Sequence, residues 1–294
     1  AGIIQRLEES YKNIRDVSRP LKVSVVFSMY KEKARLLPAS ADNPNGEDAL
    51  RIKIRQIKEV LDRNPNIAWE IIAVDNGTPD GASGKLVEEL WAHIRQEYKD
   101  KGEHLDENQV VVLYISPEEA KRLQSRKGAA VTKGLRYAVN LTPADMPSEH
   151  TPADIAIFTD ADISTDLRQI GLLVGPIEKG ESGCAIGSRW SRGAAVGGVS
   201  FLAQLSSIIY NRLVRIILPP IGKIYDTQRG FKGFSREALE AILPYTSDPG
   251  FSFDTELLLM CRLAGIGIEE VPIVWIGSEK ESKLSLRKDV QPMV

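Results

Sequence analysis

The sequence predicts an α/β fold in which a mixed, mainly parallel sheet is flanked by helices. Short runs rich in β-branched residues alternate with segments whose apolar residues recur at helical spacing. This alternation favours right-handed crossovers between parallel strands. No repeat or low-complexity linker interrupts the 294 residues, of which 43% are hydrophobic and 27% charged, so we expect a single domain over residues 1–294.

The expected elements follow one another in a regular order. Strands are expected at Lys22–Ser28, Trp69–Asp75, Gln109–Ile115, Asp154–Asp160 and Gly183–Ser188. Helical spacing is found over residues 50–61 and 86–94, and a further helix is expected to begin near Gly128. From about Gly193 the chain differs: it has an amphipathic stretch (Phe201–Leu218), two Gly/Phe-rich segments that precede helices, and a last strand (Ile268–Trp275). We expect this part to pack on the same domain.

Three of the expected strands end in polar or acidic residues. These ends are Ser28–Glu32, Asp75–Gly77 and Asp160–Asp162. In open parallel sheets, ligands bind beyond the carboxyl ends of the strands. The sequence therefore predicts one site that is built from several loops.

Asp160 and Asp162 are the strongest candidates for metal ligands. Two close carboxylates repel each other unless a cation lies between them, and Mg²⁺ or Mn²⁺ prefers oxygen ligands that it shares with phosphates. The Asp-x-Asp tripeptide also arises by chance in a chain with 40 acidic residues, and such aspartates can cap helices or form turns.

Asp75 and Lys127 each have two interpretations. Asp75 lies in "VDNGTPDG", where it can either contact a ligand or close a turn. Lys127 and Gly128 can start a helix near phosphates, or Lys127 can be a solvated lysine.

Composition excludes some classes of function. The formal net charge of −2 gives no electrostatic basis for nucleic-acid binding. Cys184 and Cys261 are expected to be buried, reduced thiols. No secretory signal and no uninterrupted apolar window of membrane-spanning length is visible, so we expect a cytoplasmic location.

Five motifs and a C-terminal trio, taken together in their order and spacing, resemble one known family. They are "VSVVFSMYKE", "VDNGTPDGAS", "RKGAAVTKGL", "FTDADIS", "AIGSRW" and the C-terminal trio "DTQRGFKGFSREAL", "FSFDTELL" and "ESKLSL". The chain resembles the inverting GT-A glycosyltransferases that include dolichol-phosphate glucosyl- and mannosyltransferases, and the C-terminal trio looks most like the glucosyl branch. The resemblance runs from about Val23 to Leu284.

The resemblance implies a role for each matching position. The expected nucleotide-sugar-binding residues are Ser28, Tyr30, Glu32, Asp75, Lys127, Gly128, Asp160, Ala161 and Asp162, of which Asp160 and Asp162 also hold the metal. Acceptor or phosphate groups are assigned to Arg189, Gln228 and Lys232, and catalytic roles to Asp226, Asp254 and Arg229. Ser28 and Lys31 depart from the usual proline and asparagine of the first motif. Ser164 stands where some relatives have a third metal ligand.

The resemblance also implies the reaction. Residues from about 20 to 190 would bind the nucleotide sugar, and residues from about 191 to 294 the acceptor. The donor would be a UDP- or GDP-linked sugar, with UDP-glucose favoured, and Mg²⁺ or Mn²⁺ the cofactor. The acceptor would be a polyprenyl or dolichyl phosphate, met peripherally at the cytosolic face of a membrane.

The nature of the acceptor decides whether a base is needed. A phosphate is already an anionic nucleophile, whereas a hydroxyl needs a general base, for which Asp226 and Asp254 are the candidates. Both aspartates can instead be structural, as a turn residue and a helix cap respectively. The stretch Phe201–Leu218 is either a core-packing helix or an amphipathic helix that places Arg212 and Arg215 at lipid head groups.

Three other functions are compatible with parts of the pattern. The chain could transfer sugar to a soluble hydroxyl acceptor, or bind nucleotide sugars without catalysis. A nucleotidyltransferase would need a glycine-rich loop after the first strand, and "FSMYKEKARLLP" contains no glycine.

Overall fold

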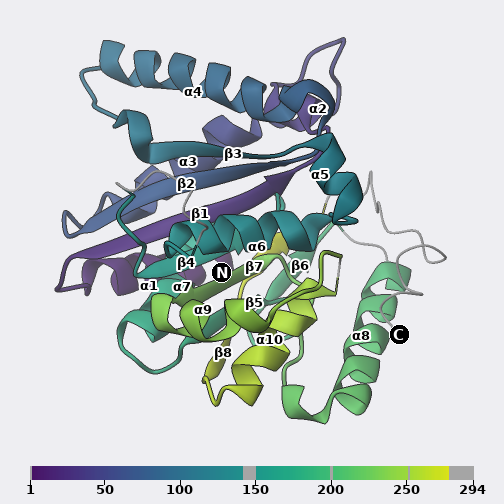
Figure 1. Cartoon of the computed structure of the whole chain (residues 1–294). Coiled ribbons are helices and arrows are strands. Elements are labelled where there is room, and N and C mark those ends of the chain that lie inside the picture. The colour runs from purple at the N-terminus through teal and green to yellow at the C-terminus, as the bar shows by residue number, and fades with distance from the viewer. Residues whose placement is uncertain (1, 142–149, 199–200, 251, 278–294) are drawn as a thin grey trace.

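A seven-stranded sheet organises the protein (Figure 1). The computed structural model describes residues 2–141, 150–198, 201–250 and 252–277. The strand order is β3-β2-β1-β4-β7-β5-β8. Its strands are β1 (Leu21–Met29), β2 (Ile67–Asn76), β3 (Val110–Ile115), β4 (Ile155–Thr159), β5 (Cys184–Ser188), β7 (Phe231–Ser235) and β8 (Ile268–Pro272).

The sheet is mixed because of one strand. β1, β2, β3 and β4 pair in parallel, as do β5 and β8, whereas β7 runs antiparallel to both β4 and β5. A smaller parallel sheet joins β6 (Ala195–Gly197) to β9 (Val274–Ile276). The predicted α/β fold with a mixed, mainly parallel sheet is confirmed.

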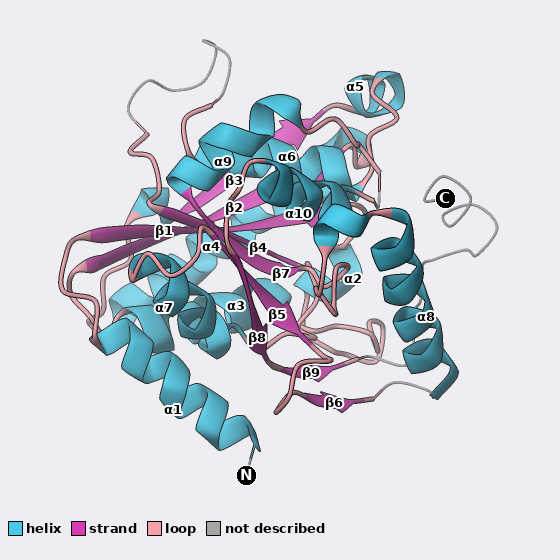
Figure 2. Ribbon diagram, turned by 90° about the horizontal axis from the view of Figure 1, so that it is seen from below, coloured by secondary structure: helices cyan, strands magenta, loops and turns pink. Residues whose placement is uncertain are grey.

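Helices cover both faces of the large sheet (Figure 2). One apolar cluster joins the sheet to α1 (Gly2–Arg15), α3 (Ala49–Leu61), α4 (Ala82–Asp100) and α7 (Ile170–Glu178). The other joins it to α6 (Lys127–Ala138), α9 (Arg236–Ile242) and α10 (Phe253–Leu263). Side chains alternate between the faces as a strand requires: in β4, Ile155 and Ile157 enter the first cluster, and Ala156 and Phe158 the second.

Short elements complete the chain. The remaining α-helices are α2 (Lys33–Leu36), α5 (Pro117–Arg122) and α8 (Phe201–Ile217). Single 3₁₀ turns occur at η1 (Pro79–Gly81), η2 (Glu107–Gln109), η3 (Leu167–Gln169), η4 (Pro219–Ile221) and η5 (Leu243–Tyr245).

The structure corrects several of the expected elements. Helix α1 and strand β7 were missing from the sequence prediction, and the last expected strand, Ile268–Trp275, is two strands, β8 and β9. The helix expected near Gly128 begins at Lys127. Cys184 and Cys261 are buried free thiols, as expected. The motif "ESKLSL" lies outside the described residues.

Helix α1 is held by close packing on α7. Ser10 Oγ accepts a hydrogen bond from the Gly171 amide at 2.9 Å and donates to the Arg168 carbonyl at 2.6 Å. A Cβ on Gly171 would lie 2.1 Å from the Ser10 carbonyl oxygen. The two helix backbones can approach this closely only where a side chain is absent.

Gly171→Ala is therefore expected to destabilise the fold by about 1–3 kcal/mol, because the added methyl group must push α1 away from α7. Urea denaturation followed by circular dichroism measures the loss. Gly197→Ala is the control, because a Cβ there has no atom within 4 Å among the described residues. Equal stability of Gly171→Ala and the wild type would contradict the described packing.

Candidate functional site

Asp160 lies at the centre of the candidate site, directly after β4. Its side chain is held by two cations: Lys127 Nζ lies 2.5 Å from Oδ1, and Arg229 pairs with Oδ2. Its amide donates to the Gly230 carbonyl at 3.1 Å, which ties it to the start of β7. Burial alone would raise the pKa of Asp160, but the charges of Lys127 and Arg229 outweigh burial and hold the pKa well below its usual range. Asp160 is therefore a carboxylate at any physiological pH.

Asp162 is the second of the two acids. It is half-buried, and its Oδ1 accepts hydrogen bonds from the amide and the hydroxyl of Ser164, at 3.0 and 2.5 Å. Ser164, the position of a third ligand in some relatives, thus orients Asp162.

Lys53, on α3, lies beneath this loop and was missed in the sequence analysis. Its ammonium donates to the main-chain carbonyls of Asp160 at 2.9 Å and Asp162 at 2.7 Å. The side chain is buried, which lowers the pKa of Lys53 to about 8 against the opposing effect of the nearby carboxylates. A lysine among Leu50, Ile54 and Ile57, on the apolar face of an amphipathic helix, is the signal that could have revealed it.

A second buried ion pair joins the ends of other strands. Arg189, after β5, binds both carboxylate oxygens of Asp226 at 2.8 Å, and its amide donates to Asp226 at 3.0 Å. Asp226 is 0% exposed. Burial would raise the pKa of Asp226, but the hydrogen bonds and charge of Arg189 outweigh it and lower the pKa. A carboxylate that is buried, bound on both oxygens and weakly basic is poorly suited to the general-base role that was one expectation for Asp226.

A third buried ion pair, between Lys232 and Asp254, lies next to Arg229. Lys232, on β7, donates to Asp254 Oδ1 and to the Arg229 carbonyl, both at 2.5 Å. Burial raises the pKa of Asp254 and lowers that of Lys232. Asp254 lies inside the first turn of α10, whose N-cap is Ser252, so the helix-cap interpretation of Asp254 is wrong.

Gln228 is the remaining residue expected at the acceptor side. It is partly buried and lies in the turn between Asp226 and Arg229. The structure therefore brings together the residues expected at the metal and at the acceptor: Asp160, Asp162, Lys127, Arg189, Asp226, Gln228, Arg229, Lys232 and Asp254.

Backbone amides at the start of α6 are hydrogen-bonded to carbonyl groups of the segment before α10. The Gly128 amide donates to the Gly250 carbonyl at 3.0 Å, and the Arg126 amide to the Pro249 carbonyl at 2.9 Å. A Cβ on Gly128 would lie 2.6 Å from the Gly250 oxygen, so glycine is required here for packing. These amides are already bonded within the chain, and contact between Lys127–Gly128 and phosphate stays a prediction.

The residues expected at the nucleotide base form a separate group. Asp75 is buried, and its two oxygens accept from the amides of Thr78 at 2.9 Å and Gly84 at 2.8 Å, which is the turn-closing role. Tyr30 is 49% exposed, and the neighbouring Lys31 amide donates to the Thr78 hydroxyl at 3.1 Å. The loop after β1 and the turn after β2 are thus joined through Thr78.

The other predicted residues of this group lie close by in the same loops. Glu32 pairs with Arg35 at 3.0 Å, Ser28 is half-buried in β1, and Ala161 packs partly against the core. Direct contact of any of them with a nucleotide stays a prediction.

Trp275, on β9, is a further residue that the sequence analysis missed. Its ring lies 4.7 Å from the Arg229 guanidinium and 5.3 Å from that of Arg189. The indole therefore lies beside both arginines that pair with the site's aspartates. The electron-rich face of its ring stabilises the positive charge of the two guanidinium groups.

The described residues include oxygen donors of the kind that a divalent metal prefers, but they supply few of the ligands that such a metal needs. Within the described ranges, no group of three or more His, Cys, Asp or Glu side chains could hold a metal. The two carboxylates of Asp160 and Asp162 are hard oxygen donors, and sites for Mg²⁺ are commonly completed by substrate phosphates and water. The pair therefore fits a metal that arrives with a diphosphate.

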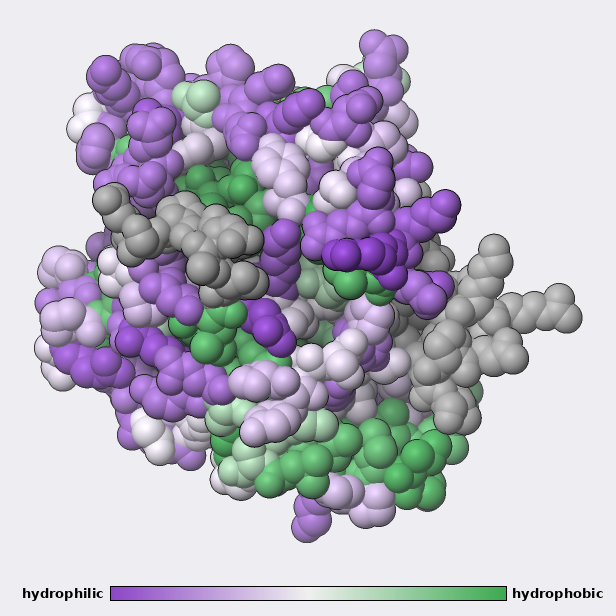
Figure 3. All heavy atoms as spheres, in the orientation of Figure 1, coloured by the Kyte–Doolittle hydropathy of each residue, from purple (hydrophilic) through white to green (hydrophobic). Residues whose placement is uncertain are grey.

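Helix α8 turns its apolar side outward. Arg212, on the same side, is also exposed, whereas Asn211 and Val214 face inward. The exposed aliphatic side chains, between 41% and 66% accessible, are Leu205, Ile208, Ile209, Leu213, Ile216 and Ile217. Figure 3 shows hydrophobic surface at the lower right, in the region where Figure 1 places α8. The core-packing interpretation of this stretch is wrong.

The inner side of α8 is bonded to the site. Asn211 Oδ1 accepts from the amide and hydroxyl of Thr227, both at 2.8 Å, and Ser207 accepts from Arg189 at 3.1 Å. None of the helices in the described part of the chain combines the length and apolar character that a membrane crossing needs.

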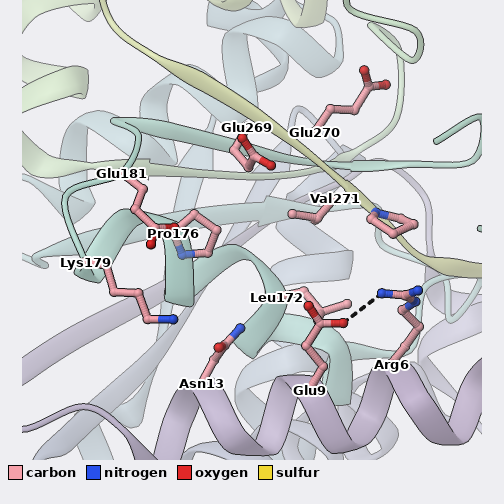
Figure 4. Close-up of a pocket in the computed structure, with 11 residues that line it drawn as sticks. Arg6, Glu9, Asn13, Leu172, Pro176, Lys179, Glu181, Glu269, Glu270 and Val271 are labelled. Carbon is pink, nitrogen blue, oxygen red and sulfur yellow. Dashed lines mark hydrogen bonds and ion pairs between the residues drawn. The ribbon is translucent and has the colours of Figure 1, made fainter. Parts of the chain in front are cut away.

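A cavity of about 250 Å³ lies apart from these strand ends (Figure 4). It is bordered by α1, α7 and β8, and charged residues of both signs, including Glu9, Lys179 and Glu181, line it. We assign it no part in the site.

Comparisons with known proteins identify the class that the chain resembles. No family model matches. Glycosyltransferase AglD of Haloferax volcanii is 28% identical over 273 residues, which cover 93% of this chain and 36% of that protein. The dolichyl-phosphate beta-glucosyltransferases of Saccharomyces cerevisiae and Dictyostelium discoideum are 25% and 26% identical, covering 86% and 91% of this chain. The matched residues make up 66% and 72% of those two proteins, respectively. The chain thus spans about a third to two thirds of the first two relatives.

Solved structures confirm the fold. Glucosyl-3-phosphoglycerate synthase from Mycobacterium tuberculosis has TM-scores of 0.54 and 0.52 in two structures, at 17% and 18% identity. The alignments cover 96% and 92% of this chain, and 78% and 74% of that one. The second structure contains Mn²⁺, UDP and glucosyl-3-phosphoglycerate. The GT-A fold and the resemblance to glycosyltransferases are therefore confirmed.

Asp226→Asn is expected to lower the free energy of unfolding at pH 7 by about 3 kcal/mol, because it leaves the Arg189 charge in a poorly solvated place without its partner. The folded pKa of Asp226 lies below its ordinary value of 3.8, so the ionised pair stabilises the fold above that pH and less so below it. The difference between wild type and variant should narrow as the pH falls below 3.8.

Urea denaturation at several pH values measures this difference. Glu97→Gln is the matched control, since Glu97 is 46% exposed in its pair with Arg51 and should change stability by less than about 1 kcal/mol. A pH-independent difference for Asp226→Asn would show that the pair is not the source of the stability.

Proposed function

We propose that this chain is a metal-dependent, inverting glycosyltransferase that moves glucose from UDP-glucose to an acceptor. The observation that carries the proposal is the Asp160–Asp162 pair at the carboxyl end of β4, surrounded by Lys53, Lys127 and Arg229. The curated relatives are named as glycosyltransferases, several of them as dolichyl-phosphate glucosyltransferases. A structural neighbour was solved with Mn²⁺ and UDP-glucose.

Asp160 and Asp162 would hold Mg²⁺ or Mn²⁺ together with the diphosphate of the donor. A bound metal offsets the charge that develops on the leaving UDP. Lys127 and Arg229, which neutralise Asp160, would also be able to bind the diphosphate if a metal took over part of that neutralisation. Tyr30, Glu32 and Asp75, in the loops after β1 and β2, would contact the base and ribose of the donor.

The acceptor would meet the anomeric carbon between Arg229 and Asp254. If it is a phosphate, the cations Arg189, Arg229 and Lys232 orient an oxygen that is already anionic. If it is a hydroxyl, Asp254 is the better base of the two candidates, because its pKa is raised by burial whereas that of Asp226 is lowered. The division into donor residues from about 20 to 190 and acceptor residues from about 191 to 294 follows this assignment.

We favour a lipid phosphate as the acceptor and a peripheral position on a cytosolic membrane face. The outer side of α8 offers six exposed aliphatic side chains around Arg212, which suits the boundary between acyl chains and anionic head groups. Its inner side bonds to Thr227 and Arg189. A lipid phosphate at α8 would therefore lie one helix diameter, about 10 Å, from the residues that would receive it.

Asp162→Ala is expected to weaken the Mn²⁺-dependent binding of UDP by at least about tenfold, because half of the protein's metal ligands are lost. Isothermal titration calorimetry with UDP, with and without Mn²⁺, measures it. Asp166→Ala is the control, since Asp166 lies four residues further on and only caps η3 and pairs with Arg168. Unchanged Mn²⁺-dependent affinity in Asp162→Ala would refute the metal assignment.

Leu213→Glu, with Ile209→Glu as a second variant, is expected to abolish flotation of the protein with vesicles of phosphatidylcholine and phosphatidylserine. Each change places a carboxylate on the face that would enter the lipid. Leu263→Glu, at a 62% exposed position on α10, is the control and should still float. If the wild type stays at the bottom of the gradient, the lipid acceptor is disfavoured and a soluble acceptor takes its place.

A further inference from the structure

Lys53 holds the loop that carries the two acids. Its ammonium lies between the carbonyl oxygens of Asp160 and Asp162, 2.9 and 2.7 Å away, and its side chain is 1% exposed. In an extended chain the carbonyls of residues i and i+2 point to the same side but lie about 6.6 Å apart, too far for one ammonium to bond to both at the distances seen here. A single donor that reaches both of them therefore fixes a bend at Ala161.

Helix α3 and the residues just before it contact the chain after Asp162 at two further points. Gln56 Oε1 accepts from the Leu167 amide at 3.0 Å, and Glu47, just before α3, accepts from the Ile163 amide at 3.3 Å. Of these three contacts, only that of Lys53 reaches the two acids themselves and brings a positive charge. Lys53 Nζ also lies 5.7 Å from the ring of Phe27 on β1, so the ammonium is packed against the sheet.

We propose that Lys53 is a positioning residue for the metal–diphosphate site: it bends the Asp160–Asp162 loop so that the two carboxylates converge on one cation before any ligand binds. The inference rests on the proposed function and assigns it a residue in α3, outside the motifs that carry the family resemblance. A buried cation beneath the loop also lowers the repulsion between the two carboxylates in the free protein. The loop then needs little rearrangement when the metal and diphosphate arrive.

The experiment compares Mn²⁺ binding in three proteins by electron paramagnetic resonance, in the presence of saturating UDP. Lys53→Met keeps the apolar stem and removes both hydrogen bonds and the charge. We expect its affinity for Mn²⁺ to fall by about tenfold or more, as for loss of a charged hydrogen-bond donor. Gln56→Leu, which removes the neighbouring loop contact without touching the acids, should keep the affinity of the wild type within about threefold.

Three outcomes would overturn the proposal. They are wild-type affinity in Lys53→Met, an equal loss in Gln56→Leu, and a loss in Lys53→Met that is matched by the loss of Mn²⁺-independent UDP binding. If Lys53→Met does not unfold cooperatively, Lys53→Arg replaces it. Its longer guanidinium cannot occupy the same point between the carbonyls, so several-fold weaker Mn²⁺ binding is expected, and wild-type affinity would refute the role.

The failure of this inference can be told apart from failure of the proposed function. If the wild type does not bind Mn²⁺ with UDP, the proposed function is wrong. If the wild type binds and Asp162→Ala does not, while Lys53→Met binds as the wild type does, only the role of Lys53 is wrong.

Discussion

Buried charges that must be paired determine the structure of the site. A series of alternating charges runs between β4, β5, β7, α6 and α10: Lys232, Asp254, Lys127, Asp160, Arg229, Asp226 and Arg189. Removing one partner of such a pair leaves an uncompensated charge in a poorly solvated place, which is far more unfavourable than the intact pair. The strand ends are therefore held in place by their side chains as well as by the sheet.

This constraint also explains why the pKa values of the aspartates are shifted in different directions. Asp226 and Asp160 face guanidinium or ammonium groups that overcome the effect of burial on the pKa, whereas for Asp254 burial prevails despite Lys232. Asp162 is half-buried like Asp160, and its Oδ1 accepts hydrogen bonds from the amide and hydroxyl of Ser164. The two carboxylates proposed to hold the metal are thus both half-buried and both bonded within the chain.

The sequence predicted the parallel strands and the acids at their ends, because buried strands and strand-end polar residues leave local patterns. It did not predict β7, whose "FKGFS" has a charged residue at a buried position: Lys232 is satisfied by Asp254, which is distant in sequence. The buried position of Lys53 was not predicted for the same reason: a lysine can be recognised as buried only when the carbonyl groups that it contacts are known. The outward face of α8 could not be predicted because helical periodicity shows that a helix has an apolar side but not where that side points.

The antiparallel strand β7 has a consequence for the modularity of the chain. It lies between β4 and β5, so residues from beyond position 225 form the middle of a sheet whose other central strands come from before position 190. A fragment that ends near residue 190 would expose the unpaired edges of β4 and β5, which invites association with other chains. The parts of the chain before residue 190 and beyond residue 225 therefore have to fold as one unit, and the C-terminal part cannot be exchanged without replacing a central strand of the sheet.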